Sequence, residues 1–129
     1  MVKVLTVREP WASLIAYGYK EYEFRNWKTN YRGELYIHAG KGFEKEYASL
    51  VETFHLPISR GMIIAKAKLV DCIPVTSEFE DALIKKDEMV YGKSRGRGGY
   101  AWKLTEIELL EHPIPCNGKL SIWNYQEED

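Results

Sequence analysis

Apolar and polar residues alternate in short stretches along most of this chain. Successive side chains of a β-strand point to opposite faces, so a period of two predicts strands with one buried face. In residues 21–25, Glu21, Glu23 and Arg25 share one face and Tyr22 and Phe24 share the other. The aromatic face is the natural core face, so we expect the charged face to point outward or into a cleft. Strands are predicted over residues 2–7, 21–25, 34–39, 62–70, 100–110 and 120–125.

A first short helix is predicted between the first two strands. Pro10 suits the first turn of a helix, and Trp11, Leu14 and Ile15 follow at helical spacing. Gly18 is a plausible stop at the C-terminal end. The helix should have about two turns, with its apolar face on the core.

Two further helices and three irregular segments are predicted. Ser77 and Glu80 form a capping-box pattern ahead of a short helix around Phe79 to Leu83. Turn or loop residues dominate at 26–33, 40–42 and 92–99, the last being rich in glycine and arginine. The other helix is amphipathic and ends before Pro57; its apolar residues are Phe43, Tyr47, Leu50, Val51 and Phe54.

These elements predict one α+β domain over residues 1–129. About six strands with two or three short helices suit a small mixed or antiparallel β-barrel decorated by helices. A parallel sheet of alternating strands and helices is disfavoured, because strict alternation of the two is missing.

Composition excludes several classes of protein. With 45% apolar and 29% charged residues in 129, the chain can form a core without a metal or disulfide. The sequence has no apolar run near the roughly 18 residues of a membrane helix and no signal peptide, so we expect a cytoplasmic protein that binds no membrane. Cys72, Cys116 and the three histidines are scattered, so neither a metal site nor a cofactor is expected.

Charge points to a local site rather than to a general affinity for nucleic acid. The net charge is only −1, which gives no global attraction to phosphates. Polar and aromatic residues are nevertheless concentrated between Arg8 and Lys41. Within that stretch the spacing G-x-K-x-x-E-x-R occurs as Gly18, Lys20, Glu23 and Arg25.

This pattern resembles the signature of the ASCH domain family. Three flanking segments extend the likeness over nearly the whole chain: Pro10-Trp11-Ala12, the segment from Asn30 to Ala39, and the closing strands with Tyr100-Ala101-Trp102 and Trp123. The resemblance implies a PUA-like barrel with a cleft beside the signature. That cleft would receive RNA or a modified nucleoside or nucleotide.

The resemblance also implies possible activities. Some members of the family hydrolyse N4-acetylcytidine, and others are linked to RNA cleavage or to coactivator roles. The hydrolytic members use a threonine nucleophile at the position of Glu23. A carboxylate does not replace a hydroxyl in the usual acyl-transfer scheme, so the hydrolase activity does not carry over directly.

The residues themselves indicate roles in binding. Acidic neighbours favour the ammonium form of Lys20, which makes it a ligand for phosphate or carbonyl oxygen and a poor base. Arg25 can hold Glu23 or a phosphate with its planar fork, and Glu23 can accept hydrogen bonds from a base. Flat rings can stack bases, and basic side chains can hold the backbone. The further ligand-binding candidates are Asn26, Trp27, Tyr31, Arg32, Lys41, Arg95 and Trp102.

Three hypotheses about function stay open at this point. The first is a binding module for RNA or a modified nucleotide. The second is a small hydrolase of N4-acylated cytidine or RNA phosphodiesters, in which Lys20 and Glu23 would be catalytic. The third is an adaptor that presents the basic loop and the acidic tail to a protein.

Each candidate also has a purely structural interpretation. The charged residues could form a surface ion-pair network of little energetic value. Trp11 and Trp123 are better explained as core residues, and His38 as a hydrogen-bonded structural histidine.

Overall fold

The computed structural model describes residues 1–92, 96 and 98–126 of the chain. Its main element is a six-stranded sheet with the strand order β2-β5-β4-β3-β1-β6. The pair β1–β3 is parallel and the other pairs are antiparallel, so the sheet is mixed. The strands are β1 (Val2–Glu9), β2 (Tyr22–Arg25), β3 (Gly33–Phe43), β4 (Met62–Pro74), β5 (Tyr100–Pro115) and β6 (Ile122–Tyr125).

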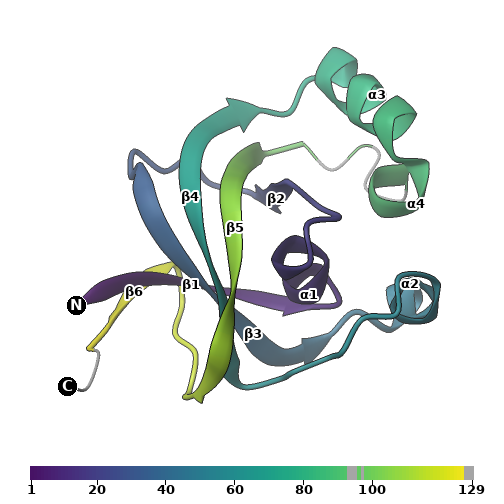
Figure 1. Cartoon of the computed structure of the whole chain (residues 1–129). Helices are drawn as coiled ribbons and strands as arrows, with labels where there is room; N and C mark the ends of the chain where they lie inside the picture. The colour runs from purple at the N-terminus through teal and green to yellow at the C-terminus, as the bar shows by residue number, and fades with distance from the viewer. Residues whose placement is uncertain (93–95, 97, 127–129) are drawn as a thin grey trace.

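The sheet is strongly curved and gives the molecule a barrel-like form. In Figure 1 the long strands β4 and β5 bend around the space that contains helix α1. Within the described residues the hydrogen-bonded order begins at β2 and ends at β6, so hydrogen bonds do not close the barrel. The predicted α+β class, with a small mixed barrel and short helices, is confirmed.

Helix α1 (Trp11–Ala16) fills the concave side of the sheet. All six of its residues are buried, and the helix packs against β1, β2, β3, β4 and β5. The core around it includes Leu5, Ile37, Leu69 and Leu104 from four different strands. Apart from Ser13 the helix is apolar all round, and such a helix is stable only when it is enclosed in this way. The predicted helix after Pro10 is therefore confirmed, and it lies at the centre of the fold.

Short helices follow β3 and β4 and lie at the periphery of the fold (Figure 1). The 3₁₀ turn η1 (Lys45–Tyr47) and helix α2 (Ala48–Thr53) follow β3, while α3 (Ser77–Lys86) and α4 (Glu88–Tyr91) connect β4 to β5. A second apolar cluster holds α3 and α4 against β2. Its buried members are Tyr22, Phe24, Leu83, Val90, Tyr91 and Ala101.

The predicted turn at residues 40–42 is wrong. Strand β3 continues through these residues to Phe43, because Phe43 pairs with Glu9 of β1 after a register shift. The helix predicted from Phe43 to Phe54 is consequently shorter and begins after the strand. Pairing with a distant strand overrode the local preference of two glycines for a turn.

The predicted cap of helix α3 is displaced by one residue. Thr76, rather than Ser77, precedes the helix, and the Phe79 backbone N–H donates to the Thr76 hydroxyl oxygen over 3.1 Å. The Glu80 carboxylate instead accepts the backbone N–H of Gly96 at 2.8 and 2.9 Å, so it takes no part in a capping box.

This cap gives a test of the boundary. Replacing a threonine N-cap by alanine costs about 1 kcal/mol of stability. We therefore expect Thr76→Ala to lower the free energy of unfolding by about that amount in urea titrations. The neighbouring Ser77→Ala, inside the helix, should leave the free energy of unfolding nearly unchanged. A larger loss of stability in Ser77→Ala than in Thr76→Ala would contradict the assignment of Thr76 as the N-cap.

A buried carboxyl group lies where β1 meets α1. Both Glu9 oxygens are bonded to Ser13: Oε1 accepts its backbone N–H at 2.7 Å, and Oε2 accepts its hydroxyl at 2.6 Å. The Ser59 backbone N–H also donates to Oε2, over 3.3 Å. Burial nevertheless raises the pKa of the Glu9 carboxyl above its usual value, against the opposing effect of these hydrogen bonds.

The direction of this shift predicts a pH dependence of stability. A raised carboxyl pKa means that the folded state favours the protonated form. The stabilising contribution is therefore present below the ordinary carboxyl pKa of about 4.3 and is lost as pH rises through the raised value. Glu9→Gln removes this titration, so the stability of the wild-type protein relative to Glu9→Gln should fall as pH rises across that range. Urea titrations at a series of pH values measure the difference; a difference that is constant with pH would contradict the assignment.

Candidate functional site

The junction between α1 and β2 brings Lys20 into the interior. Gly18 adopts a φ of +83°, which reverses the chain after the helix. The backbone N–H groups of Tyr19 and Lys20 then both donate to the Leu14 carbonyl, over 2.8 and 3.1 Å. These bonds hold the chain against the end of the helix before it enters β2. The lysine side chain is thereby only 2% exposed.

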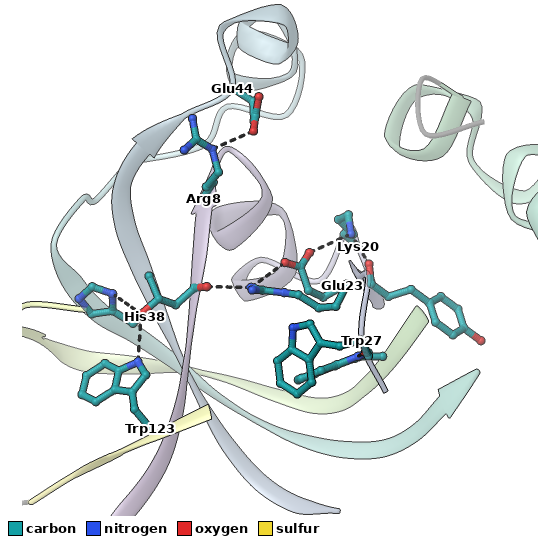
Figure 2. Close-up of polar contacts among 11 residues, drawn as sticks. Arg8, Lys20, Glu23, Trp27, His38, Glu44 and Trp123 are labelled. Atoms are coloured by element: carbon teal, nitrogen blue, oxygen red, sulfur yellow. Dashed lines mark hydrogen bonds and ion pairs between the residues drawn. The ribbon is translucent and has the colours of Figure 1, made fainter. Parts of the chain in front are cut away.

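Lys20, Glu23 and Arg25 form a charged cluster. Lys20 Nζ lies 3.5 Å from Glu23 Oε1, and Arg25 Nη2 lies 3.0 Å from Glu23 Oε2. Lys20 Nζ also donates to the Tyr22 carbonyl, and Arg25 Nη2 donates to the Thr6 carbonyl over 2.7 Å. Figure 2 shows the Glu23 carboxylate between the two cationic groups. The contact between Arg25 and Glu23 is the one that the sequence analysis considers for this pair.

Aromatic rings surround the Lys20 ammonium group on its other sides. Its nitrogen lies 4.7 Å from the ring centre of Phe24, 5.5 Å from that of Trp11 and 5.7 Å from that of Tyr91. Cations over ring faces at such distances are stabilised by the ring quadrupole, more so when water is excluded. The rings therefore help to hold a charged group in a buried position.

The charged cluster lines a cavity of about 400 Å³, which we call the first cavity. This volume is within the range of small-molecule sites. Arg8 and Glu44 also line it and pair at 2.8 Å, with Arg8 largely exposed. Of the lining residues, three are cationic and two anionic, so the formal charge of the lining is +1. They are Thr6, Arg8, Trp11, Lys20, Glu23, Phe24, Arg25, Asn26, Glu44, Gly98 and Gly99.

Gly99 is required where the chain passes the end of β2. It has a φ of +72°, and a Cβ atom there would lie 2.5 Å from the Arg25 carbonyl oxygen. A side chain is thus excluded by both backbone conformation and space. The glycine keeps this wall of the first cavity close to Arg25.

The two faces of β2 have different surroundings. Tyr22 and Phe24 are buried in the second apolar cluster, as the alternation predicted. On the opposite face Glu23 and Arg25 line the first cavity, whereas Glu21 pairs with Lys86 at 2.6 Å. Two residues of the charged face therefore line the cavity, and the third forms an exposed ion pair with α3.

The other predicted ligand-binding residues are distributed more widely. Asn26 lines the first cavity, but Trp27 and Trp102 do not. Trp102 is completely buried, and its indole N–H donates to the Trp27 carbonyl over 3.3 Å. The two indole rings meet edge to face at 4.7 Å, which makes them a packing pair. Trp102 therefore offers no stacking surface in this structure.

Tyr31 and Arg32 stabilise their own loop. The Tyr31 hydroxyl donates to the Glu34 carbonyl, and Arg32 Nη1 donates to the carbonyls of Thr29 and Tyr31. Neither residue lines the first cavity, and Lys41 lines a different cavity. Arg95 lies outside the described residues, as do Lys93, Ser94 and Arg97 of the predicted basic loop.

Residues that the sequence reasoning missed come mainly from β1 and its surroundings. Thr6 and Arg8 line the first cavity from β1, and Glu44 follows the end of β3. The signal for the first two was present, because the alternation of Val2–Glu9 places Thr6 and Arg8 on one face. Glu44 had no such signal, since the pairing of Phe43 with Glu9 carries it there.

His38 and Trp123 have the structural roles that the sequence suggested. Trp123 is a buried residue of an apolar cluster, and its indole N–H donates to the Thr6 hydroxyl oxygen over 3.0 Å. His38 Nε2 lies 2.8 Å from the Cys116 carbonyl, and Nδ1 lies 3.3 Å from the Thr6 hydroxyl. A carbonyl only accepts, so Nε2 carries a hydrogen and donates.

The part of the chain that the structure describes contains neither a membrane-spanning helix nor a group of metal-ligating side chains. None of its helices has the length and apolarity needed to cross a membrane. No three of its His, Cys, Asp and Glu side chains gather into a group that could hold a metal ion.

Comparison with known proteins identifies the family. The sequence model of the ASCH domain matches residues 5–114. The human protein Activating signal cointegrator 1 is 33% identical over an alignment that covers 54% of this chain and 14% of that protein. The chain thus corresponds to a small part of that relative's length. A crystal structure of a mutant of the ZmASCH protein from Zymomonas mobilis has the same fold, with a TM-score of 0.53 at 16% identity, covering 88% of this chain and 72% of that one. The chain belongs to the ASCH domain family, which is generally associated with RNA binding.

Proposed function

We propose that this domain binds single-stranded RNA or a modified nucleotide, with one nucleotide held in the first cavity by Lys20, Glu23 and Arg25. The observation that carries the proposal is the convergence of these three side chains on one cavity of about 400 Å³. Such a cavity with a few fixed polar groups and apolar walls is typical of small-ligand sites.

The polar groups complement a nucleotide. The net positive lining favours a phosphate, which a guanidinium binds through its planar fork. The Glu23 carboxylate accepts hydrogen bonds, so it suits the exocyclic amine or ring N–H of an unpaired base. Asn26 adds an amide that can both donate and accept.

An unsatisfied donor supports the same site. Among the described residues, the one buried side-chain nitrogen or oxygen without a hydrogen-bond partner is Arg25 Nε. Leaving such a donor without an acceptor costs about 1–3 kcal/mol. An acceptor bound beside the guanidinium, such as a phosphate oxygen, would satisfy it after a small movement of the side chain.

The apolar contacts come from rings other than those expected from the sequence. Trp11 and Phe24 line the first cavity, whereas Trp27 packs on Trp102. A base in this cavity would therefore lie against Trp11 or Phe24. These rings also face the Lys20 ammonium, so ligand and lysine would share the same aromatic surroundings.

The surroundings of Glu23 favour binding over hydrolysis. Glu23 occupies the position at which the hydrolytic members carry a threonine, and its two oxygens are directed to Lys20 and Arg25. A carboxylate held between two cations is a fixed acceptor for a ligand rather than an acyl-transfer nucleophile.

Titration with nucleoside 5′-monophosphates and short single-stranded RNA tests the proposal. Charge-assisted hydrogen bonds contribute about 1.5–3 kcal/mol, which corresponds to roughly 10–100-fold in affinity. Lys20→Met and Arg25→Lys should each weaken binding by a factor of that order. Lys3→Met, at an exposed position that lines neither cavity, is the matched control and should bind as the wild type does.

Thermal melting separates loss of binding from loss of fold. Arg25→Lys retains the positive charge beside Glu23 and should keep a cooperative transition. A folded Arg25→Lys protein that binds with unchanged affinity would contradict the role of the guanidinium. Wild-type protein that binds no nucleotide or RNA more tightly than millimolar would contradict the proposed function.

A further inference from the structure

A second cavity, of about 480 Å³, lies on the other side of strand β1 from Arg25. Thr6 and His38 line it from the sheet, and the segment between β5 and β6 forms the opposite wall. Three of its ten lining residues are glycines, which leaves backbone accessible to a ligand. The lining residues are Thr6, His38, Gly40, Lys41, Gly61, Cys116, Asn117, Gly118, Lys119 and Leu120.

The charge of this second cavity is positive. Two lysines, Lys41 and Lys119, line it and are exposed, and none of its described lining residues is acidic. Burial raises the pKa of the Cys116 thiol, so this group adds no negative charge near neutral pH. A ligand for this cavity should therefore be anionic.

The same cavity also has apolar surface for a flat group. Leu120 is 92% exposed, which is unusual for a large aliphatic side chain next to a cavity. Cys116 contributes a weakly polar side chain beside it. Apolar contact beside two cations fits a base attached to a phosphate better than it fits a simple inorganic anion.

Thr6 connects the two cavities. It lines both of them, and its carbonyl oxygen accepts from Arg25 while its hydroxyl contacts His38 and Trp123. Figure 2 shows a continuous series of polar contacts from Lys20 and Glu23 across β1 to His38 and Trp123. The two cavities are therefore adjacent and separated by one strand.

We infer that the second cavity is a subsite for a neighbouring nucleotide, so that the ligand is a single-stranded oligonucleotide crossing β1 at Thr6. This inference rests on the proposed function of the first cavity. Lys41 and Lys119 would hold the backbone phosphate, and Leu120 would contact the base. A free nucleoside would fill only one of the two cavities.

The test compares a nucleoside monophosphate with a short oligonucleotide. In single strands each phosphate contact contributes about 0.7 to the slope of log K against log salt concentration. Lys41→Gln combined with Lys119→Gln should weaken oligonucleotide binding about tenfold or more and reduce that slope by about 0.7, the contribution of one phosphate. Binding of the monophosphate should stay unchanged. Lys3→Gln is the control and should leave the affinity for both ligands unchanged.

The outcomes separate this inference from the proposed function. Unchanged oligonucleotide binding in the double variant, with monophosphate binding intact, would overturn the second subsite alone. Equal weakening of the binding of both ligands would also overturn the second subsite, because the lysines would then act on the first cavity. An acidic peptide that binds through the same two lysines, where the oligonucleotide does not, would assign the cavity to a protein partner instead. If the wild-type protein binds neither the monophosphate nor the oligonucleotide, both proposals are wrong.

Discussion

The site depends on the burial of one ammonium group. Transfer of an isolated charge out of water costs several kcal/mol even after relaxation, so a buried lysine needs compensation on every side. Lys20 has Glu23, the Tyr22 carbonyl and three aromatic rings around it. These partners come from α1, β2 and α4. The buried charge of Lys20 therefore requires α1, β2 and α4 to pack together around it.

That requirement explains why the cavity lies where it does. The carboxylate that compensates Lys20 also holds Arg25, and Arg25 in turn reaches the backbone of β1. The carboxylate is held by two cations, and one of these also bonds to the backbone of a second strand. A site of this kind is preorganised, and preorganisation reduces the conformational entropy that the protein loses when a ligand binds.

Strand β1 has an unusual position in this arrangement. It lies between β3 and β6, and it supplies Thr6 at the boundary between the two cavities. Leu5 and Val7 on its other face are completely buried in the core. The strand therefore fixes the distance between the two cavities, and its polar face is their common wall. A domain with a net charge of only −1 can thus present two positively charged hollows side by side.

The sequence by itself determined the six strands, the central helix and the three charged residues. Alternation or strand-forming composition predicted each strand, and the spacing of Gly18, Lys20, Glu23 and Arg25 is short enough for local geometry to bring the side chains together. Tertiary structure decided what surrounds them. The extension of β3 through Gly40 and Gly42 and the burial of Trp102 both depend on partners far away in the chain. Periodicity describes which residues share a face of one element, whereas a cavity is formed between elements, and long-range packing sets their relative positions.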